Sequence, residues 1–183
     1  ADGAMGTLLH ARGRHSLESP IDSLSLSHPD QVKSIHLDYL SSGSELIQTN
    51  TFGANAVRLS VQGMADQVEA INRASVSLAK EANRKSGTDA FIAGSIGPLG
   101  RNSPLFNVLD SGVGHNAFAQ QASILSQEGV DVLLLETFPT LAEIHLAIQA
   151  VKSVTDLPII AQLTFTEEGL TPTGETPRQV VEL

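Results

Sequence analysis

The chain has 183 residues, with 20 acidic and 11 basic side chains, a formal net charge of −9 and no cysteine. Hydrophobic residues make up 41% and charged residues 17%, so the chain can bury a core and is not compositionally disordered. The acidic balance and the scattered basic residues exclude a nucleic-acid surface. No apolar run approaches the roughly 20 residues of a membrane helix, and no signal peptide is present, so we expect a cytoplasmic location.

Apolar segments alternate with helical patterns along the chain. Short segments rich in Leu or β-branched residues predict strands that are buried on both faces. In chain order these strands cover residues 45–49, 90–94, 130–135 and 158–165. Apolar residues three and four apart predict helices between them. These helices cover residues 32–39, 66–82, 117–125 and 140–151, and a fifth begins at Thr176-Pro177, with proline at the first helical position.

Three predicted helix ends carry recognisable capping residues. Asp66 with Glu69, and Thr140 with Glu143, have the spacing of a capping box at a helix start. Gly129 is suited to the left-handed position that follows a helix. These signals fix where we expect the second, third and fourth helices to begin or end.

Repeated strand–helix units predict a parallel sheet, in one of two α/β folds. The predicted strands start roughly 38 residues apart, so eight units would need roughly 300 residues, and the chain would hold half to five-eighths of a (β/α)₈ barrel. An open, doubly wound sheet of five strands would fit the chain whole. In both folds ligands bind at the carboxyl ends of the strands.

The predicted strand exits are polar and rich in glycine. They cover residues 2–7, 49–55, 94–100, 136–138 and 164–167. Glu136 directly follows a buried strand, so its carboxylate needs a partner. That partner is either a neighbouring cation or loop amide, or a substrate ammonium, and a general-base role is also open. Asp2 presents the same choice.

Glycines near the N-terminus suggest close backbone approach to a ligand. Gly3 and Gly6 would let successive N–H groups hold a carboxylate, with a plain tight turn as the alternative. Residues 94–100 have G-x-x-G-x-x-G spacing, which matches neither a dinucleotide fingerprint nor a P-loop.

Other catalytic arrangements find little support. The histidines show no metal-ligand spacing; they are His10, His15, His28, His36, His115 and His145. Lysines fall in helical segments rather than on strands, which argues against a Schiff-base enzyme. No G-x-S-x-G nucleophile motif is present. Residue types alone therefore predict a parallel α/β domain with an acidic rim that binds a small zwitterion, with its chemistry open.

The strand exits together resemble a known family. D-G-A-M-G-T at 2–7, Q-T-N-T-F-G-A-N at 48–55, A-G-S-I-G-P-L-G at 93–100 and L-E-T-F at 135–138 resemble the homocysteine-binding domain of the homocysteine S-methyltransferases. The resemblance spans essentially the whole chain. Residues 161–169 and 173–177 further resemble the bacterial branch that is fused to methylenetetrahydrofolate reductase.

The resemblance implies a (β/α)₈ barrel of which residues 1–183 are a partial domain, truncated at both ends. It also implies zinc held by three cysteine thiolates, which activates the thiol of homocysteine for methylation to methionine. The chain has no cysteine, so the zinc ligands are expected downstream, no catalytic residue is assigned within it, and the fragment alone is expected to be inactive. FAD is expected only in a fused reductase module outside the chain.

The resemblance also assigns substrate-binding residues. Glu136 and Asp2 would face the substrate ammonium. The backbone N–H groups of Gly3, Ala4 and Met5 would take its carboxylate. Thr49 and Asn50 would line the pocket near the sulfur.

Several functional alternatives stay open. The methyl donor would be 5-methyltetrahydrofolate or S-methylmethionine, with the fused-type motifs favouring the folate. A non-catalytic amino-acid-binding domain is one alternative, and a metal-independent lyase or hydrolase that uses Asp2 and Glu136 as acid and base is another. A half barrel would expose strand edges, so a homo-oligomer is possible.

Overall fold

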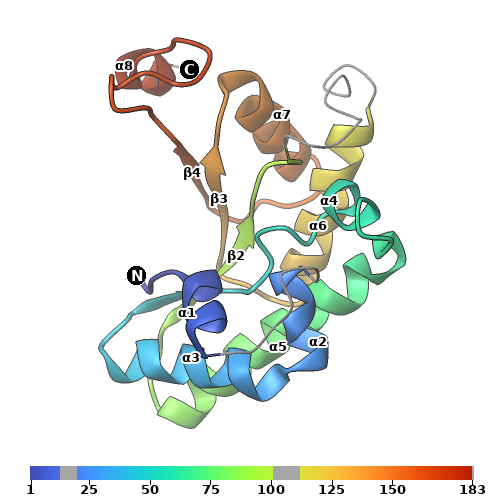
Figure 1. Ribbon diagram of the computed structural model, residues 1–183, viewed down its shortest axis with the longest axis vertical. Coiled ribbons are helices and arrows are strands. Elements are labelled where there is room, and N and C mark those ends of the chain that lie inside the picture. Colours follow the sequence, from blue (N-terminus) through green and yellow to red (C-terminus); the bar gives the residue numbers. More distant parts are fainter. Residues whose placement is uncertain (13–19, 101–111, 183) are drawn as a thin grey trace.

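A computed structural model of the chain describes residues 1–12, 20–100 and 112–182 (Figure 1). Its strands are β1 (Leu46–Gln48), β2 (Phe91–Ile96), β3 (Val132–Phe138) and β4 (Ile159–Leu163). Its α-helices are α1 (Met5–Arg12), α2 (Leu24–Ser27), α3 (Pro29–Ser41), α4 (Ala56–Ser60), α5 (Val68–Ser86), α6 (Val113–Gln127), α7 (Leu141–Lys152) and α8 (Pro177–Val181). Two 3₁₀ turns, η1 (Ile21–Ser23) and η2 (Ala65–Gln67), precede α2 and α5.

The strand order decides between the two α/β folds that the sequence left open. The strands form one parallel sheet in the order β1-β2-β3-β4. Each strand is added on the same side of its predecessor, without the reversal of order that defines a doubly wound sheet. The Asp2 backbone N–H donates to the Leu46 carbonyl at 2.9 Å, so the N-terminal segment lies beside β1. The α/β fold with successive parallel strands is confirmed, and its winding is that of a barrel.

The two faces of the sheet carry different apolar layers. Side chains such as Ile47, Ile92 and Leu133 point toward α5, α6 and α7 and belong to the largest core cluster. Residues one position away point to the opposite face, where Ala93 and Leu134 belong to a much smaller cluster. The helices cover one face of the sheet (Figure 1), and the smaller cluster packs on the other.

Strand β4 departs from the expectation that all four strands are buried on both faces. Ile160, the second residue of β4, is 39% exposed, and the other residues of the strand are intermediate or exposed. β4 forms the edge of the described sheet, with β3 as its neighbour on one side. An apolar composition therefore predicted the strand correctly but not its burial, which depends on a second neighbour.

The helix starts confirm some of the capping predictions and correct others. Thr140 caps α7, because its hydroxyl accepts the Glu143 N–H at 3.3 Å. The Glu143 carboxylate, however, accepts the Leu99 N–H at 2.7 Å and leaves the capping box open. Asp66 does not cap α5 through its side chain, because the 3₁₀ turn η2 occupies residues 65–67 and α5 begins afterwards.

The ends of the remaining helices agree with the sequence. Gly129 has a φ of 74°, the left-handed conformation expected after α6. Thr176 and Gln179 form a complete capping box at the start of α8. The short helices α1, α2 and α4 were not predicted, because four to eight residues give too little periodicity to recognise. Among the described helices, none has the length and apolarity needed to cross a membrane.

Candidate functional site

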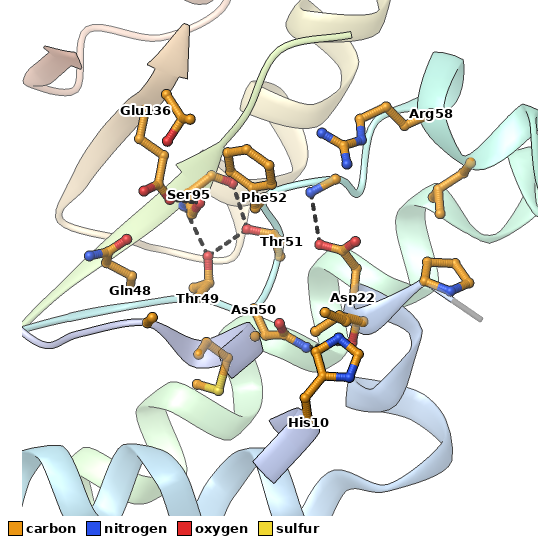
Figure 2. A pocket seen from close by; sticks show the side chains of 18 of the residues that line it. His10, Asp22, Gln48, Thr49, Asn50, Thr51, Phe52, Arg58, Ser95 and Glu136 are labelled. Carbon is orange, nitrogen blue, oxygen red and sulfur yellow. Dashed lines mark hydrogen bonds between the residues drawn. The ribbon is translucent and has the colours of Figure 1, made fainter. Parts of the chain in front are cut away.

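A cavity of about 690 Å³ lies at the carboxyl ends of the first three strands. Its walls come from the start of α1, the loop after β1, the ends of β2 and β3, and the segments around η1 and α4. Its volume is within the range of roughly 300–1,000 Å³ that is usual for small-molecule sites. Figure 2 shows that polar side chains from these separate elements meet around one space.

Glu136 enters this cavity from the end of β3. Its carboxylate Oε1 accepts a hydrogen bond from the Ser95 hydroxyl at the end of β2 (Figure 2). Burial raises the pKa of Glu136, and the Ser95 hydrogen bond partly opposes that rise. The carboxylate is thus partly desolvated and has no salt bridge with any described residue. Such a group can receive a cationic ligand.

The backbone is distorted directly after Glu136. The pairing of β3 with β4 shifts register between Leu135 and Phe138, and Thr137 has a φ of 62°. A β-branched residue rarely adopts this left-handed conformation, and such outliers cluster at functional sites. Because of this irregularity, Glu136 and Thr137 both line the cavity. In a regular strand, two consecutive side chains would point to opposite faces of the sheet.

Three backbone amides border the same cavity next to the start of α1. Gly3, Ala4 and Met5 border the cavity, and no described residue accepts a hydrogen bond from their N–H groups. Gly3 and Ala4 precede α1 and Met5 is its first residue, so none of these three N–H groups is used within the helix and all can bind an external acceptor. Glycine is also favoured at position 3 for a structural reason, because a Cβ there would lie 2.9 Å from the Tyr39 hydroxyl oxygen.

Asp2 is set apart from the other predicted site residues. Its Oδ2 accepts the Gln48 N–H at 2.8 Å, and its buried Oδ1 has no partner in the described part of the chain. Burial raises the pKa of Asp2 to about 6, against the opposing effect of the Gln48 hydrogen bond. Asp2 is not among the residues that line the cavity, whereas Gln48 is. Asp2 is thus joined through one carboxylate oxygen to the backbone of a residue that lines the cavity.

Thr49 and Asn50 line the cavity, but their side chains already have partners. The Thr49 hydroxyl accepts the Ser95 N–H at 3.1 Å and shares a 2.6 Å hydrogen bond with Thr51. The Asn50 amide donates to the Ile21 carbonyl at 2.9 Å. Both side chains are buried. They shape and fix the wall, and they offer few free hydrogen-bonding groups to a ligand.

The sequence analysis missed the far end of the cavity. Asp22 is buried there, and its Oδ1 accepts the Gly53 N–H at 2.8 Å. Burial raises the pKa of Asp22, while the Gly53 hydrogen bond and the charge of Arg58 oppose the rise. The Arg58 guanidinium lies 5.1 Å from the centre of the Phe52 ring. Asp22 falls in a segment without periodicity, so no sequence signal identified it.

The described residues do not provide a metal site. No group of three or more His, Asp or Glu side chains lies close enough together within residues 1–12, 20–100 and 112–182 to hold an ion. His36 is fully buried in α3, and His15 lies outside the described residues. The chain has no cysteine, so the thiolate set expected for the full domain does not fit these residues.

Comparison with solved structures supports the barrel arrangement. The homocysteine methyltransferase MmuM from Escherichia coli matches in its metallated form with a TM-score of 0.77 and 25% identity, over 99% of this chain and 68% of that one. Its oxidized form matches with a TM-score of 0.80 and 27% identity, over 100% of this chain and 67% of that one. The chain therefore corresponds to about two thirds of a methyltransferase domain.

Sequence comparison gives the same relationship. Methionine synthase of Mycobacterium tuberculosis (strain ATCC 25618 / H37Rv) is 26% identical in an alignment of 181 residues that covers 92% of this chain and 15% of that protein. The chain thus spans only a small part of that relative. The family model described as homocysteine S-methyltransferase matches residues 1–183. With the match covering every residue and the fold in agreement, the chain belongs to the homocysteine S-methyltransferase family.

Proposed function

We propose that this chain binds homocysteine for S-methylation, with the amino acid held by its two charged groups. The observation that carries the proposal is one cavity bordered by the Glu136 carboxylate and by the amides of Gly3, Ala4 and Met5, whose N–H groups have no acceptor among the described residues. An α-amino acid presents an ammonium and a carboxylate, which complement these two walls. The family match supplies the identity of the amino acid.

The residues of the chain account for binding and orientation. Glu136 accepts hydrogen bonds from the ammonium, and the amides of Gly3, Ala4 and Met5 donate to the carboxylate, so the thiol-bearing side chain points away from both. Holding a nucleophile in one orientation makes its reaction with a second substrate effectively intramolecular. In the full domain, zinc supplied by residues outside this chain would activate the thiol, and we assign no step of methyl transfer to the residues present.

The methyl donor that we favour is 5-methyltetrahydrofolate. Support comes from residues 161–169 and 173–177, which resemble the form fused to methylenetetrahydrofolate reductase. These residues do not line the cavity, so they bear on the identity of the branch rather than on donor binding. S-methylmethionine is the competing donor, and titration of both into the homocysteine-bound full-length protein would separate them.

The test is calorimetric titration of the 183-residue chain with L-homocysteine under reducing conditions. Glu136→Gln removes the charge but keeps the shape, and we expect it to weaken binding by about tenfold or more, since a hydrogen bond to a charged group is worth roughly 1.5–3 kcal/mol. Glu45→Gln is the matched control, because Glu45 is exposed at the other end of β1. Equal affinities for the two variants would contradict the proposal.

Ligand analogues test the two walls separately. 3-(Methylthio)propylamine lacks the carboxylate and 4-(methylthio)butanoate lacks the ammonium, so each should bind more weakly than L-methionine. Glu136→Gln should weaken binding of the amine and leave binding of the butanoate unaffected. A non-catalytic amino-acid-binding domain predicts that homocysteine binding by the full-length protein is indifferent to a chelator, whereas the methyltransferase predicts that a chelator weakens it.

A further inference from the structure

Ser95 links the Glu136 carboxylate to the rest of the site. Among the described residues, its hydroxyl makes the one hydrogen bond that this carboxylate accepts. Ser95 is 1% exposed and stands on the face of β2 that carries Ala93, opposite the face covered by helices. Its side chain therefore points toward the cavity, where it can fix one carboxylate oxygen.

All three polar groups of Ser95 are engaged. Its N–H donates to the Thr49 hydroxyl at 3.1 Å, and its carbonyl accepts from the Thr51 hydroxyl at 2.7 Å. Thr49 and Thr51 are joined to each other at 2.6 Å, which closes a ring of hydrogen bonds around Ser95 (Figure 2). A serine held at its N–H and its carbonyl has little freedom to move its hydroxyl away from Glu136.

The loop that surrounds Ser95 is anchored from the helix layer. The Gln121 amide of α6 donates to the Thr51 carbonyl at 2.7 Å, and Asn72 of α5 donates to the Ala54 carbonyl at 2.8 Å. Both side chains are fully buried. The hydrogen bonds thus run without interruption from α6 through Thr51 and Ser95 to Glu136.

We propose that Ser95 is a positioning residue that orients the Glu136 carboxylate for the substrate ammonium, and that Thr51 and Gln121 hold Ser95 in place. This inference rests on the proposed function, in which Glu136 contacts the substrate. Ser95 acts through Glu136: its hydroxyl occupies one oxygen and leaves the other directed at the ligand. A donor to the carboxylate also favours its charged form, which an ammonium requires.

A double-mutant cycle with L-methionine tests the linkage. Ser95→Ala should weaken binding by about tenfold, the effect of losing one hydrogen bond to a charged group. In the Glu136→Gln background the same change should cause much less additional loss, because the carboxylate that Ser95 orients is gone. An equal loss in both backgrounds would show that Ser95 acts on the fold alone and would overturn the inference.

The titration of Glu136 gives a second measurement that needs no ligand. We expect Ser95→Ala to raise the pKa of the Glu136 carboxyl, because the hydrogen bond that opposes the effect of burial is removed. Carbon NMR of the carboxyl group during a pH titration measures this pKa. The other charged or titratable groups that line the cavity are His10, Asp22 and Arg58, and Asp2 accepts a hydrogen bond from the backbone of Gln48, which also lines it. An unchanged Glu136 pKa would overturn the inference, whereas absence of methionine and homocysteine binding with a shifted pKa would contradict the proposed function instead.

Control variants separate the positioning role from loss of folding. Ser75→Ala makes the same change at another fully buried serine, which contacts Ser25 and does not line the cavity. It should leave both the affinity and the Glu136 pKa unchanged, and equal effects from the two serines would count against Ser95. If Ser95→Ala does not fold, Ser95→Cys fills the site with a slightly larger side chain and a weaker donor, and it should shift both measurements in the same directions.

Discussion

At the scale of single residues, His36 is a buried group whose charge state is set by its surroundings. Its ring is fully buried in α3, and neither ring nitrogen has a partner among the described residues. Burial lowers the pKa of His36 to about 4, from 6.5 in an unperturbed histidine. The folded protein therefore holds the neutral ring, and protonation favours unfolding.

The sign of this linkage gives a pH prediction. Because the folded-state pKa is depressed, the stability that His36 contributes is present above pH 6.5 and is lost as the pH falls toward 4. Between pH 7 and pH 5, His36 should lower the unfolding free energy of the unmodified chain by about 2 kcal/mol, and His36→Leu should abolish this part of the decrease. Urea denaturation at the two pH values measures it.

Two comparisons isolate the effect of His36. His145→Leu changes an exposed histidine of α7 and should leave the pH dependence as it is in the unmodified chain. Asp2 acts in the opposite direction, because its raised pKa lowers stability as the pH rises from 3.8 to about 6. The His36→Leu variant must therefore be compared with the unmodified chain. If the unfolding free energy changes with pH by the same amount in both, the role assigned to His36 is contradicted.

At the scale of elements, the exits of β1 and β2 are locked together by a close backbone contact. The Gly97 N–H donates to the Phe52 carbonyl at 2.8 Å. A Cβ on Gly97 would lie 2.6 Å from that same carbonyl oxygen and 2.5 Å from the Phe52 ring. Only glycine therefore allows the β2 exit to lie against the loop that carries Thr49 and Thr51.

Gly97→Ala should force these two loops apart. We expect a loss of about 1–3 kcal/mol in unfolding free energy, the usual cost of overpacking, together with weaker homocysteine binding. Gly6→Ala is the matched control, because a Cβ there would meet just the flexible end of Ile21, at 3.2 Å. Gly6 lines the cavity, so the two variants are compared by thermal unfolding alone, and equal stability would contradict the close-contact argument.

At the scale of the whole molecule, the described sheet ends in an apolar edge. β4 pairs with β3 on one side, and Ile160 on β4 and the nearby Phe165 are each 39% exposed. An unpaired strand edge with apolar side chains readily pairs with another chain. The 183-residue chain should therefore associate with itself through β4.

Sedimentation over a range of concentrations tests this association. Ile160→Lys places a charge on the edge strand and should shift the chain toward the monomer, because a buried lysine at a strand–strand contact is costly. Val181→Lys is the control, since Val181 is 84% exposed on α8 and away from the sheet edge. Monomeric behaviour of the unmodified chain at high concentration would contradict the prediction.

The sequence by itself determined the strands, the longer helices and the family. Period and capping are local properties, so Thr140 and the Thr176-Pro177 pair marked real helix starts. The position of Glu136 directly after an apolar run was enough to place it at a strand exit. Several motifs in fixed order identified the family although each motif alone was weak.

Only the tertiary structure decided the winding of the sheet and the partners of the site residues. The order β1-β2-β3-β4 depends on which strands pair, and strand pairing leaves no trace in the period of any one segment. Ser95 meets Glu136 because β2 and β3 are neighbours in register, 41 residues apart in sequence. Asp22 joins the cavity through the Gly53 amide in the same way. These contacts join residues that are far apart in the sequence. The local pattern around a residue depends only on its neighbours in the chain, so it does not reveal which distant residues the fold places in contact with it.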